Sequence, residues 1–441
     1  MTAPGPRGWQ PDAFVGHVAE VLGELNRRHD RRLVLRACVD LPPGATAADT
    51  AILPRVAWRA PFGLETEAIG VAQRCPLTAV RWLHDAPHPD DLAQLQAWLA
   101  AHPLLADAVM ACGFPELHDD GVRVPLQLWL PRVWLTALAD GRTELSLVLL
   151  GEDDPDVVLQ ALRHLLAVLA VPPPSLAPVV AADVAAPGHL AAIGKLVAAM
   201  RAGEAQKVVW SRTLPLAGTW QRGTLAARMR AARPEAWVVD VQLPDGENIL
   251  CATPELLLAC HGAEVRTMAL AGTGSLAQLA ADDARLGDEH GRVRDFVRDR
   301  LAQLGARGLT LQADIGQAGP LAHRRTHITG QRQPGMDALT TALTLHPTPA
   351  LLGLPRQAAL ALLAVLEPPR GLYGGCLARL ACDGSGDGEA VVLLRGVAET
   401  AGRWQARAGA GLVPDSVPVD EAAEIAQKLA AIVQSLSPEA P

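Results

Sequence analysis

The feature that most constrains the fold is a recurring pair of apolar, strand-like segments joined by a short turn. From Val122 to Leu130 apolar residues alternate at period two, Asp140-Gly141 marks a turn, and Glu144–Leu150 supplies a partner strand. Two similar hairpins are predicted later in the chain, at Trp237–Leu243 with Asn248–Ala252 and at Leu256–Cys260 with Glu264–Leu270. The pattern predicts antiparallel sheet in both halves of the chain.

Apolar residues at helical spacing predict a smaller set of helices. These are Leu190–Met200, Asp288–Leu304, Pro355–Leu366 and Val419–Leu436, with three strands between the last two. Because the helices do not alternate with the strands, the sequence predicts an α+β protein rather than a doubly wound parallel sheet. Residues 171–188 are rich in Pro and Ala and predict an extended connector. The length of 441 residues permits one large domain or two ordinary ones.

Composition excludes several classes of protein. With 49% hydrophobic residues the chain can bury a large core. Its 47 acidic and 39 basic side chains give a net charge of -8 without a basic stripe, which argues against a nucleic-acid partner. The seven cysteines show no metal-binding spacing, as expected of thiols in a reducing compartment. Since no apolar run reaches the length of a signal peptide or a membrane span, we expect a cytoplasmic protein without a membrane partner.

One glycine-rich turn resembles a dinucleotide-binding motif. The segment GTGSLA, residues 272–277, follows a predicted strand and fits the pattern G-x-G-x-x-A. A dinucleotide fold requires this turn inside a βαβ unit, whereas here the preceding strand belongs to a hairpin. A dehydrogenase is therefore a remote hypothesis.

Carboxylates in the C-terminal half suggest a Mg²⁺ site. Glu421, Glu424 and Lys428 share one face of the terminal helix, and the glycine-rich segment 408–416 precedes them. Glu289, at the start of another helix, could add a further carboxylate, because Mg²⁺ prefers hard oxygen ligands. The alternative is that these side chains form a solvated i,i+4 pair on the surface.

Two further residues could act as a base and an acid. Lys207 begins the apolar strand KVVWSR, and desolvation beside another cation would lower the pKa of its amine. Glu255 precedes the apolar run LLLA, and burial there would raise the pKa of its carboxyl. The residues alone thus predict an α+β protein with a candidate acid, base and Mg²⁺ site.

An ordered series of segments resembles the chorismate-utilising family of isochorismate, salicylate, anthranilate and aminodeoxychorismate synthases. The segments are KVVWSR (207–212), PELLL (254–258), ALAGT (269–273), DEH (288–290), RRTHITG (324–330), LHPTPALLGLPR (345–356), RGLYGG (370–375), LLR (393–395), AGAG (408–411) and DSVPVDEAAEIAQK (415–428). Weaker likeness at 109–116 and 128–132 extends the resemblance into the N-terminal half. It implies one domain over 1–441, with an N-terminal part, 1–188, and catalytic motifs in 189–436. The implied fold is two large antiparallel sheets packed face to face with helices outside.

The resemblance also implies roles for individual residues. Lys207 matches the base that activates water, and Glu255 matches the general acid. Glu289 and Glu424 match the Mg²⁺ ligands, with Glu421 beside them. The groups implied to bind substrate are Gly272, Thr273, His327, Ala350, Tyr373, Arg395, Gly409 and Lys428.

Three positions distinguish members of the family. Members that use ammonia have glutamine in place of Lys207, aminodeoxychorismate synthases have lysine in place of Ala271, and pyruvate-eliminating members have threonine in place of Ala350. All three positions indicate an isochorismate synthase, for menaquinone or siderophore biosynthesis. The implied reaction is the reversible, Mg²⁺-dependent conversion of chorismate to isochorismate, by water attack at C2 and loss of the C4 hydroxyl. No organic cofactor and no obligate protein partner are implied.

Two alternatives remain open at this stage. A salicylate synthase would form isochorismate and then eliminate pyruvate, and a non-catalytic homologue would only bind chorismate. The chain also departs from the family pattern before Glu289, where the segment is short and reads Arg285-Leu286 instead of a basic-acidic pair.

Overall fold

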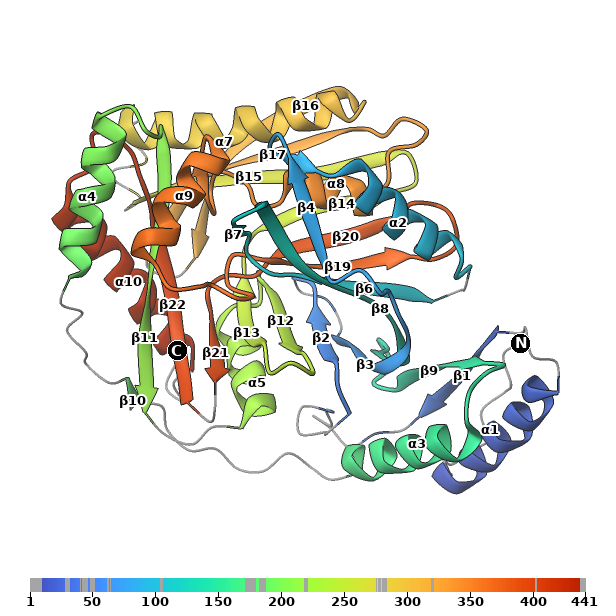
Figure 1. Ribbon diagram of the computed structural model, residues 1–441. Helices are drawn as coiled ribbons and strands as arrows, with labels where there is room; N and C mark the ends of the chain where they lie inside the picture. The colour runs from blue at the N-terminus through green and yellow to red at the C-terminus, as the bar shows by residue number, and fades with distance from the viewer. Residues whose placement is uncertain are drawn as a thin grey trace.

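We describe the protein from a computed structural model, with elements labelled as in Figure 1. The described residues are 10–27, 32–39, 41, 47, 52–61, 63, 65–103, 106–170, 180–181, 188–217, 221–274, 276, 279, 284–318, 321–400 and 403–436. No helix within them is long and apolar enough to span a membrane. Most of the predicted connector, 171–188, lies outside the described residues, although Val180–Ala181 within it forms the short strand β10.

Two antiparallel sheets form the body of the protein. The first contains, in neighbour order, β11 (Lys207–Ala217), β22 (Arg403–Leu412), β21 (Gly396–Thr400), β13 (Asn248–Thr253), β12 (Trp237–Gln242), β2 (Arg55–Arg59), β3 (Glu65–Arg74), β8 (Gly121–Ala137), β9 (Thr143–Leu150) and β1 (Arg32–Val39). The second continues from β8 through β6 (Asp107–Cys112), β19 (Cys376–Ala381), β20 (Gly388–Val392), β14 (Leu256–His261), β15 (Glu264–Gly274) and β17 (Leu321–Gln331) to β16 (Arg307–Ala318). In Figure 1 strands β11, β22, β21, β13, β12 and β2 of the first sheet run up and down the view, whereas β14, β19 and β20 run across it.

The long strand β8 belongs to both sheets. Its last residues pair with β9 and its middle residues, 126–129, pair with β6. Two short connections also carry the chain directly from one sheet to the other, Pro254–Glu255 between β13 and β14, and Leu393–Arg395 between β20 and β21. Short strands at the edges are β4 (Ala79–Leu83), β5 (Ala86–Pro87), β7 (Glu116–His118) and β18 (Gly353–Leu354). The two crossing points matter because they bring side chains to the junction of the sheets.

Strand alternation divides the apolar side chains between the interior and the outer faces. Val239 of β12 packs with Val109 of β6 and Leu377 of β19, so the two sheets face each other across an apolar interior. The next residue along β12, Val238, lies on the opposite face, in the cluster that contains Leu225 of the covering helix α5 (Arg222–Ala232).

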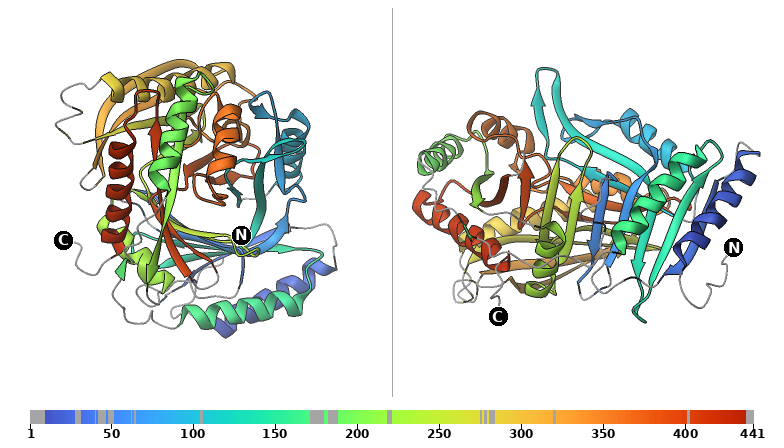
Figure 2. Two further views of the ribbon diagram at one scale, coloured as in Figure 1. Left: turned by 60° about the vertical axis from the view of Figure 1, so that its left-hand side comes forward. Right: turned by 90° about the horizontal axis from the view of Figure 1, so that it is seen from below.

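The helices cover the outside of the sheets. Figure 2 shows α1 (Pro11–Asn26) and α3 (Pro155–Leu169) side by side on one flank, and α4 (His189–Arg201) with α10 (Pro418–Leu436) on the opposite flank. Helix α7 (Ala284–Gln303) packs along β15, and α10 packs along β22. The remaining helices of the described residues are α2 (Pro89–Ala100), α8 (Ala338–Leu345) and α9 (Arg356–Leu366).

The structure confirms the α+β architecture and the three predicted hairpins, which are β8–β9, β12–β13 and β14–β15. The prediction of three strands after α9 is wrong, because the chain breaks at Leu393–Arg395 and forms four strands, β19 to β22. Strand β15 pairs antiparallel with both β14 and β17. The glycine-rich segment at its end is therefore outside any βαβ unit, as the sequence predicted.

A buried ionic cluster ties the first sheet to helix α5. Arg55 Nη1 lies 2.6 Å from Asp240 Oδ2, and Arg55 Nη2 lies 3.0 Å from Glu67 Oε1. Arg222 Nη1 approaches the other oxygen of Asp240 at 3.2 Å. These charges are paired inside the protein, as buried charges must be.

Candidate active site

Most of the predicted functional side chains meet in one cavity of about 80 Å³ at the junction of the two sheets. Glu255 and Arg395 line it from the two crossing connections, β13–β14 and β20–β21. The other predicted residues that line it are Gly272, Thr273, Glu289, Ala350, Tyr373, Gly409, Glu424 and Lys428. Lining residues that the sequence did not predict include Val209, Leu270, His323, Leu351, Arg370 and Leu394.

Glu255 is the buried acid of this cavity. Only 3% of the residue is exposed, and burial raises the pKa of its carboxyl to about 8, although the positive charges of Arg395 and Lys207 oppose the shift. Its backbone is fixed at the crossing, because its N–H donates to Thr253 Oγ1 and its C=O accepts from the Val392 N–H. The carboxyl is therefore protonated at neutral pH and able to donate a proton into the cavity.

Lys207 lies directly behind the cavity wall, at the start of β11. The residue has no exposed surface, and its Nζ lies 2.8 Å from Glu289 Oε1 on α7. Gly411 of β22 makes this contact possible. A Cβ there would overlap Glu289 Oε1 and come within 3.1 Å of Lys207 Nζ. Because only glycine leaves this space, the AGAG segment allows Lys207 and Glu289 to contact each other.

A second lysine and carboxylate pair lies on α10. Lys428 Nζ is 2.6 Å from Glu424 Oε1 and donates to the carbonyl oxygen of Gly409 at 2.9 Å. Glu421, one turn earlier, does not line the cavity. Its Oε1 accepts a hydrogen bond of 2.7 Å from the Ser416 hydroxyl. The first turn of α10 directs this carboxylate toward the loop that precedes the helix, so the structure does not place Glu421 beside the cavity carboxylates.

Two of the cavity carboxylates could bind Mg²⁺. Within the described residues no group of three or more His, Cys, Asp or Glu side chains is arranged to hold a metal ion. Glu289 and Glu424 nevertheless offer carboxylate oxygens to the same cavity. This donor set fits Mg²⁺, which commonly binds through one or two carboxylates completed by water and substrate oxygens.

Arg395 is held in an unusual backbone conformation. Its φ of 61° lies in the left-handed region, which costs a residue with a side chain about 1–3 kcal/mol. The backbone is anchored by a hydrogen bond from the Ala252 N–H to the Arg395 carbonyl oxygen. Burial lowers the pKa of its guanidinium, whereas the Glu424 carboxylate lies close enough to oppose this shift and stabilise the charge. The arginine is thus a fixed cation at the junction of the sheets.

His323 connects Arg395 to Thr273. Arg395 Nη2 lies 2.9 Å from His323 Nε2, and His323 Nδ1 lies 2.9 Å from Thr273 Oγ1. Because a guanidinium can only donate, Nε2 accepts, and the ring proton is assigned to Nδ1, which donates to Thr273. Burial and Arg395 hold the pKa of His323 well below its usual range, so the ring is neutral. The Thr273 hydroxyl then keeps its own proton free to donate toward a ligand.

His327, the histidine expected in the cavity, lies elsewhere. Its side chain is 40% exposed, its Nε2 is 3.7 Å from Asp314 Oδ2, and it does not line the cavity. His323 and His327 lie on the same face of β17, but only His323 pairs with Thr273, whereas His327 pairs with Met268. The register of β15 and β17 therefore decides which histidine reaches the site.

Small residues shape the wall near α7. Gly272 has a φ of 74°, and a Cβ there would lie only 2.8 Å from the carbonyl oxygen of Leu286, so this close approach requires glycine. Ala350 lines the cavity and packs against Ala271 and Val293. The alanine methyl leaves the cavity wall apolar at this point.

Similar proteins show which family the chain belongs to. The sequence profile of the chorismate binding enzyme family matches residues 167–434, more than half of the chain. The chain belongs to the chorismate binding enzyme family. Putative isochorismate synthase MenF of Mycobacterium tuberculosis (strain ATCC 25618 / H37Rv) is 35% identical over 260 residues, which cover 54% of this chain and 69% of that protein. Isochorismate synthase EntC of Escherichia coli (strain K12) is 32% identical over 247 residues, covering 52% of this chain and 62% of EntC, less than two thirds of its length.

Solved structures of this family share the fold. The menaquinone-specific isochorismate synthase MenF from Escherichia coli matches with a TM-score of 0.76 at 23% identity, over 97% of this chain and 100% of that one. Anthranilate synthase component I from Streptococcus pneumoniae TIGR4 matches with a TM-score of 0.62 at 16% identity, over 87% and 93% of the two chains. The two-sheet fold of a chorismate binding enzyme is therefore established for this chain.

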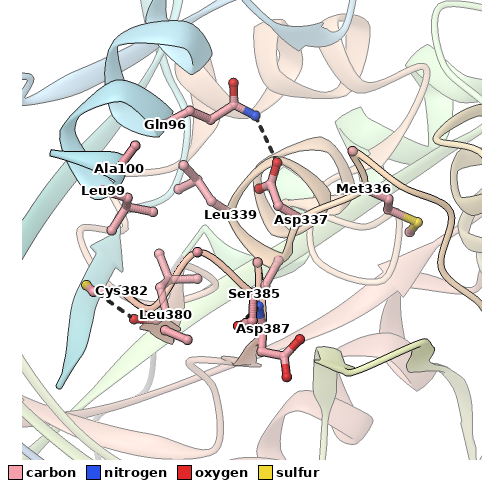
Figure 3. A pocket seen from close by; sticks show the side chains of 15 residues that line it. Gln96, Leu99, Ala100, Met336, Asp337, Leu339, Leu380, Cys382, Ser385 and Asp387 are labelled. Carbon is pink, nitrogen blue, oxygen red and sulfur yellow. Dashed lines mark hydrogen bonds between the residues drawn. The ribbon is translucent and has the colours of Figure 1, made fainter. Parts of the chain in front are cut away.

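A larger cavity, of about 370 Å³, lies between α2, the start of α8 and the β19–β20 turn (Figure 3). Gln96 Nε2 donates to Asp337 Oδ2 at 2.8 Å, and Asp337 also caps α8 through the Thr340 N–H. Burial raises the pKa of the Cys382 thiol there to about 11, which keeps it protonated. This described lining has no acid and base comparable to Glu255 and Lys207, so the chemistry of the smaller cavity, not size, identifies the candidate active site.

Proposed function

We propose that this chain is an isochorismate synthase, which converts chorismate reversibly to isochorismate. The observation that carries the proposal is the buried, protonated Glu255 in one cavity with Arg395 and Lys428, next to the Lys207–Glu289 pair. Such an isomerisation needs an acid, a base and cations that bind the two carboxylates of the substrate. The relatives named isochorismate synthase support the same reaction.

The acid–base chemistry is assigned to Lys207 and Glu255. Lys207, as a neutral amine, takes a proton at Nζ from a water molecule as the water oxygen bonds to C2 of the substrate. The ring double bond shifts, and Glu255 gives its proton to the C4 hydroxyl, which leaves as water. One water is consumed and one is released, so the reaction is an isomerisation. Gly411 supports the assignment to Lys207, because it lines the cavity and a Cβ on it would lie within 3.1 Å of the amine.

Cationic and hydroxyl groups hold the two carboxylates of the substrate. Arg395 and Lys428, with Tyr373, are assigned to the enolpyruvyl carboxylate, where charge-assisted hydrogen bonds are strongest. The Thr273 hydroxyl, oriented by His323, is assigned to the ring carboxylate, whose charge grows as the double bond shifts.

We also propose that Glu289 and Glu424 hold Mg²⁺ at the cavity. When bound, the ion supplies positive charge that neutralises the ring carboxylate, which serves as an electron sink. Lys207 and Lys428 are then free to change partners, since each now pairs with one of these carboxylates.

Product analysis tests the proposal against its alternatives. Purified protein is incubated with chorismate and Mg²⁺, and the products are separated by chromatography. Isochorismate at equilibrium with chorismate, with little pyruvate, supports an isochorismate synthase. Stoichiometric pyruvate and salicylate would make the chain a salicylate synthase, whereas binding of chorismate without any product would make it a non-catalytic homologue.

A further inference from the structure

Behind one wall of the cavity lies a buried cluster of three charged residues, Glu367, Arg370 and Arg407. Glu367 follows α9, and its side chain is only 2% exposed. Arg370 approaches both carboxylate oxygens, with Nη2 at 2.7 Å and Nε at 2.9 Å, and Arg407 Nη2 lies 2.6 Å from Oε1. The two arginines hold the pKa of this carboxyl below its usual value despite its burial, so the cluster carries a net charge of one positive unit.

Arg370 connects this carboxylate to two parts of the cavity wall. Its Nη1 donates to the carbonyl oxygen of Leu351 at 2.8 Å, and its Nη2 donates to that of Val209 at 2.5 Å. Both of these residues line the cavity, as does Arg370 itself. Leu351 directly follows Ala350, so the arginine fixes the loop that carries this alanine to strand β11.

Arg407 connects the same carboxylate to Tyr373. Its Cζ lies 5.4 Å from the centroid of the tyrosine ring, within the range of a cation–π interaction. Its Nε donates to the Ser211 hydroxyl at 2.8 Å and its Nη1 donates to the Pro369 carbonyl oxygen at 3.0 Å. These contacts hold the Arg407 guanidinium over the face of the Tyr373 ring, next to the cavity.

We propose that Glu367 is a positioning residue, which sets the place of Tyr373 and of the Ala350–Leu351 loop through Arg407 and Arg370. This proposal rests on the proposed function, in which Tyr373 contacts the substrate. Without the carboxylate, two buried guanidinium groups would repel each other and lose their common acceptor. Since Tyr373 is assigned to a carboxylate remote from the reacting C2 and C4, its displacement weakens binding in the ground state and the transition state alike.

The first test compares Glu367→Gln with Asp240→Asn. Both changes remove one buried carboxylate charge that is paired with two arginines, but Asp240 belongs to the Arg55 cluster away from the cavity. Glu367→Gln is expected to raise KM for chorismate ~10- to 100-fold with kcat within about threefold, as loss of a charged hydrogen bond predicts. Asp240→Asn is expected to leave KM within about twofold. An unchanged KM in Glu367→Gln, or an equal rise in Asp240→Asn, would overturn the proposal.

The second test does not depend on turnover. Tyr373 is the single tyrosine of the chain, so fluorotyrosine incorporation gives one fluorine NMR signal for this ring. The signal is expected to shift in Glu367→Gln and to coincide with that of the unsubstituted protein in Asp240→Asn. Coinciding signals in all three proteins would refute the positioning role. If the unsubstituted protein has no turnover but the fluorine signal still shifts in Glu367→Gln, the proposed function is refuted and the positioning role of Glu367 is retained.

A second variant covers the case in which Glu367→Gln does not fold. Arg407→Lys keeps the positive charge but removes the planar guanidinium that lies over Tyr373. It is expected to shift the fluorine signal and to raise KM, and an unshifted signal in this variant would also overturn the proposal.

Discussion

Lys207 Nζ lies 2.8 Å from Glu289 Oε1, so a lysine amino group without exposed surface lies within hydrogen-bond distance of a carboxylate on the cavity wall. Lys207 belongs to β11 and Glu289 to α7, and the two residues are 82 positions apart in the chain. Leaving a buried polar group without a partner is costly, so each side chain helps to hold the other in this place. The pair links the proposed base to the proposed metal ligand.

Lys207→Met is expected to abolish turnover while the fold is retained. The substitution removes the group that takes the proton of the attacking water, an effect worth ~10²–10⁴ in rate. The measurement is kcat with chorismate, together with thermal unfolding. Lys195→Met, at an exposed position of α4, is the matched control and should keep full activity. Wild-type turnover in Lys207→Met would remove the lysine from the mechanism.

The activity is expected to fall as pH rises through about 8. Burial raises the pKa of Glu255 to about 8, so above this pH the acid loses the proton that it must deliver. The measurement is kcat/KM across the alkaline range, and Glu255→Gln should lose nearly all turnover at every pH. A profile that stays flat well above pH 8 would contradict the assignment.

The same carboxyl makes an independent contribution to stability. A group with a raised pKa binds its proton more tightly in the folded chain, so its contribution is complete below its ordinary value of 4.5 and is lost as pH rises through about 8. The unfolding free energy of Glu255→Gln should therefore depend less on pH across this window than that of the unsubstituted protein. Chemical denaturation at several pH values measures the difference.

The sequence predicts contacts between residues that are close together in the chain better than contacts between distant segments. The hairpins are local, and their turn residues predict them directly. The start of α3 is also marked locally, by Asp154 as a capping residue before Pro155. The role of Glu255 as general acid comes from the family resemblance, and no local pattern marks its place at a crossing between the sheets.

The differences between the expected and the observed places of site residues arise from long-range geometry. His323 and His327 lie on one face of a strand, and only the register with β15 distinguishes them. Glu421 and Glu424 share a helical face, but their places relative to the cavity depend on the loop before α10. A buried carboxylate such as Glu367 is indistinguishable in sequence from a surface one, because its partners include Arg407, forty positions away.

Glu424→Gln and Glu421→Gln are expected to differ in their demand for Mg²⁺. Glu424 lines the cavity, so its loss should raise the Mg²⁺ concentration needed for half-maximal activity by roughly tenfold or more. Glu421 bonds to Ser416 outside the cavity, so its loss should lower thermal stability and leave the Mg²⁺ requirement unchanged. Titration of EDTA-treated protein with Mg²⁺ gives both values. Full activity in excess EDTA would exclude a metal from the reaction.

His323→Ala and His327→Ala provide a matched pair on β17. Removing His323 frees the Thr273 hydroxyl and deprives Arg395 of an acceptor, so kcat/KM should fall ~10- to 100-fold. Removing the half-exposed His327 breaks only its contact with Asp314 and should change kcat/KM less than about twofold. Steady-state kinetics of both variants decide the assignment, which would be reversed if His327→Ala were the impaired protein.

Ala350→Thr is expected to release pyruvate and salicylate from chorismate. Ala350 lines the cavity at the start of the loop that Arg370 holds through Leu351, and threonine would add a hydroxyl and a methyl group there. The hydroxyl could hold isochorismate in the site while its enolpyruvyl group leaves. Because Ala350 packs against Ala271 and Val293, the added atoms also cost ~1–3 kcal/mol by overpacking.

Ala350→Val separates these two effects, since valine has the shape of threonine without the hydroxyl. A lactate dehydrogenase assay for pyruvate and salicylate fluorescence are measured for all three proteins. We expect pyruvate from the threonine variant alone and a similar loss of stability in both variants. Equal pyruvate release from Ala350→Val would assign the effect to bulk, and abundant pyruvate from the unsubstituted protein would overturn the isochorismate synthase proposal, because alanine at this position would then not prevent elimination.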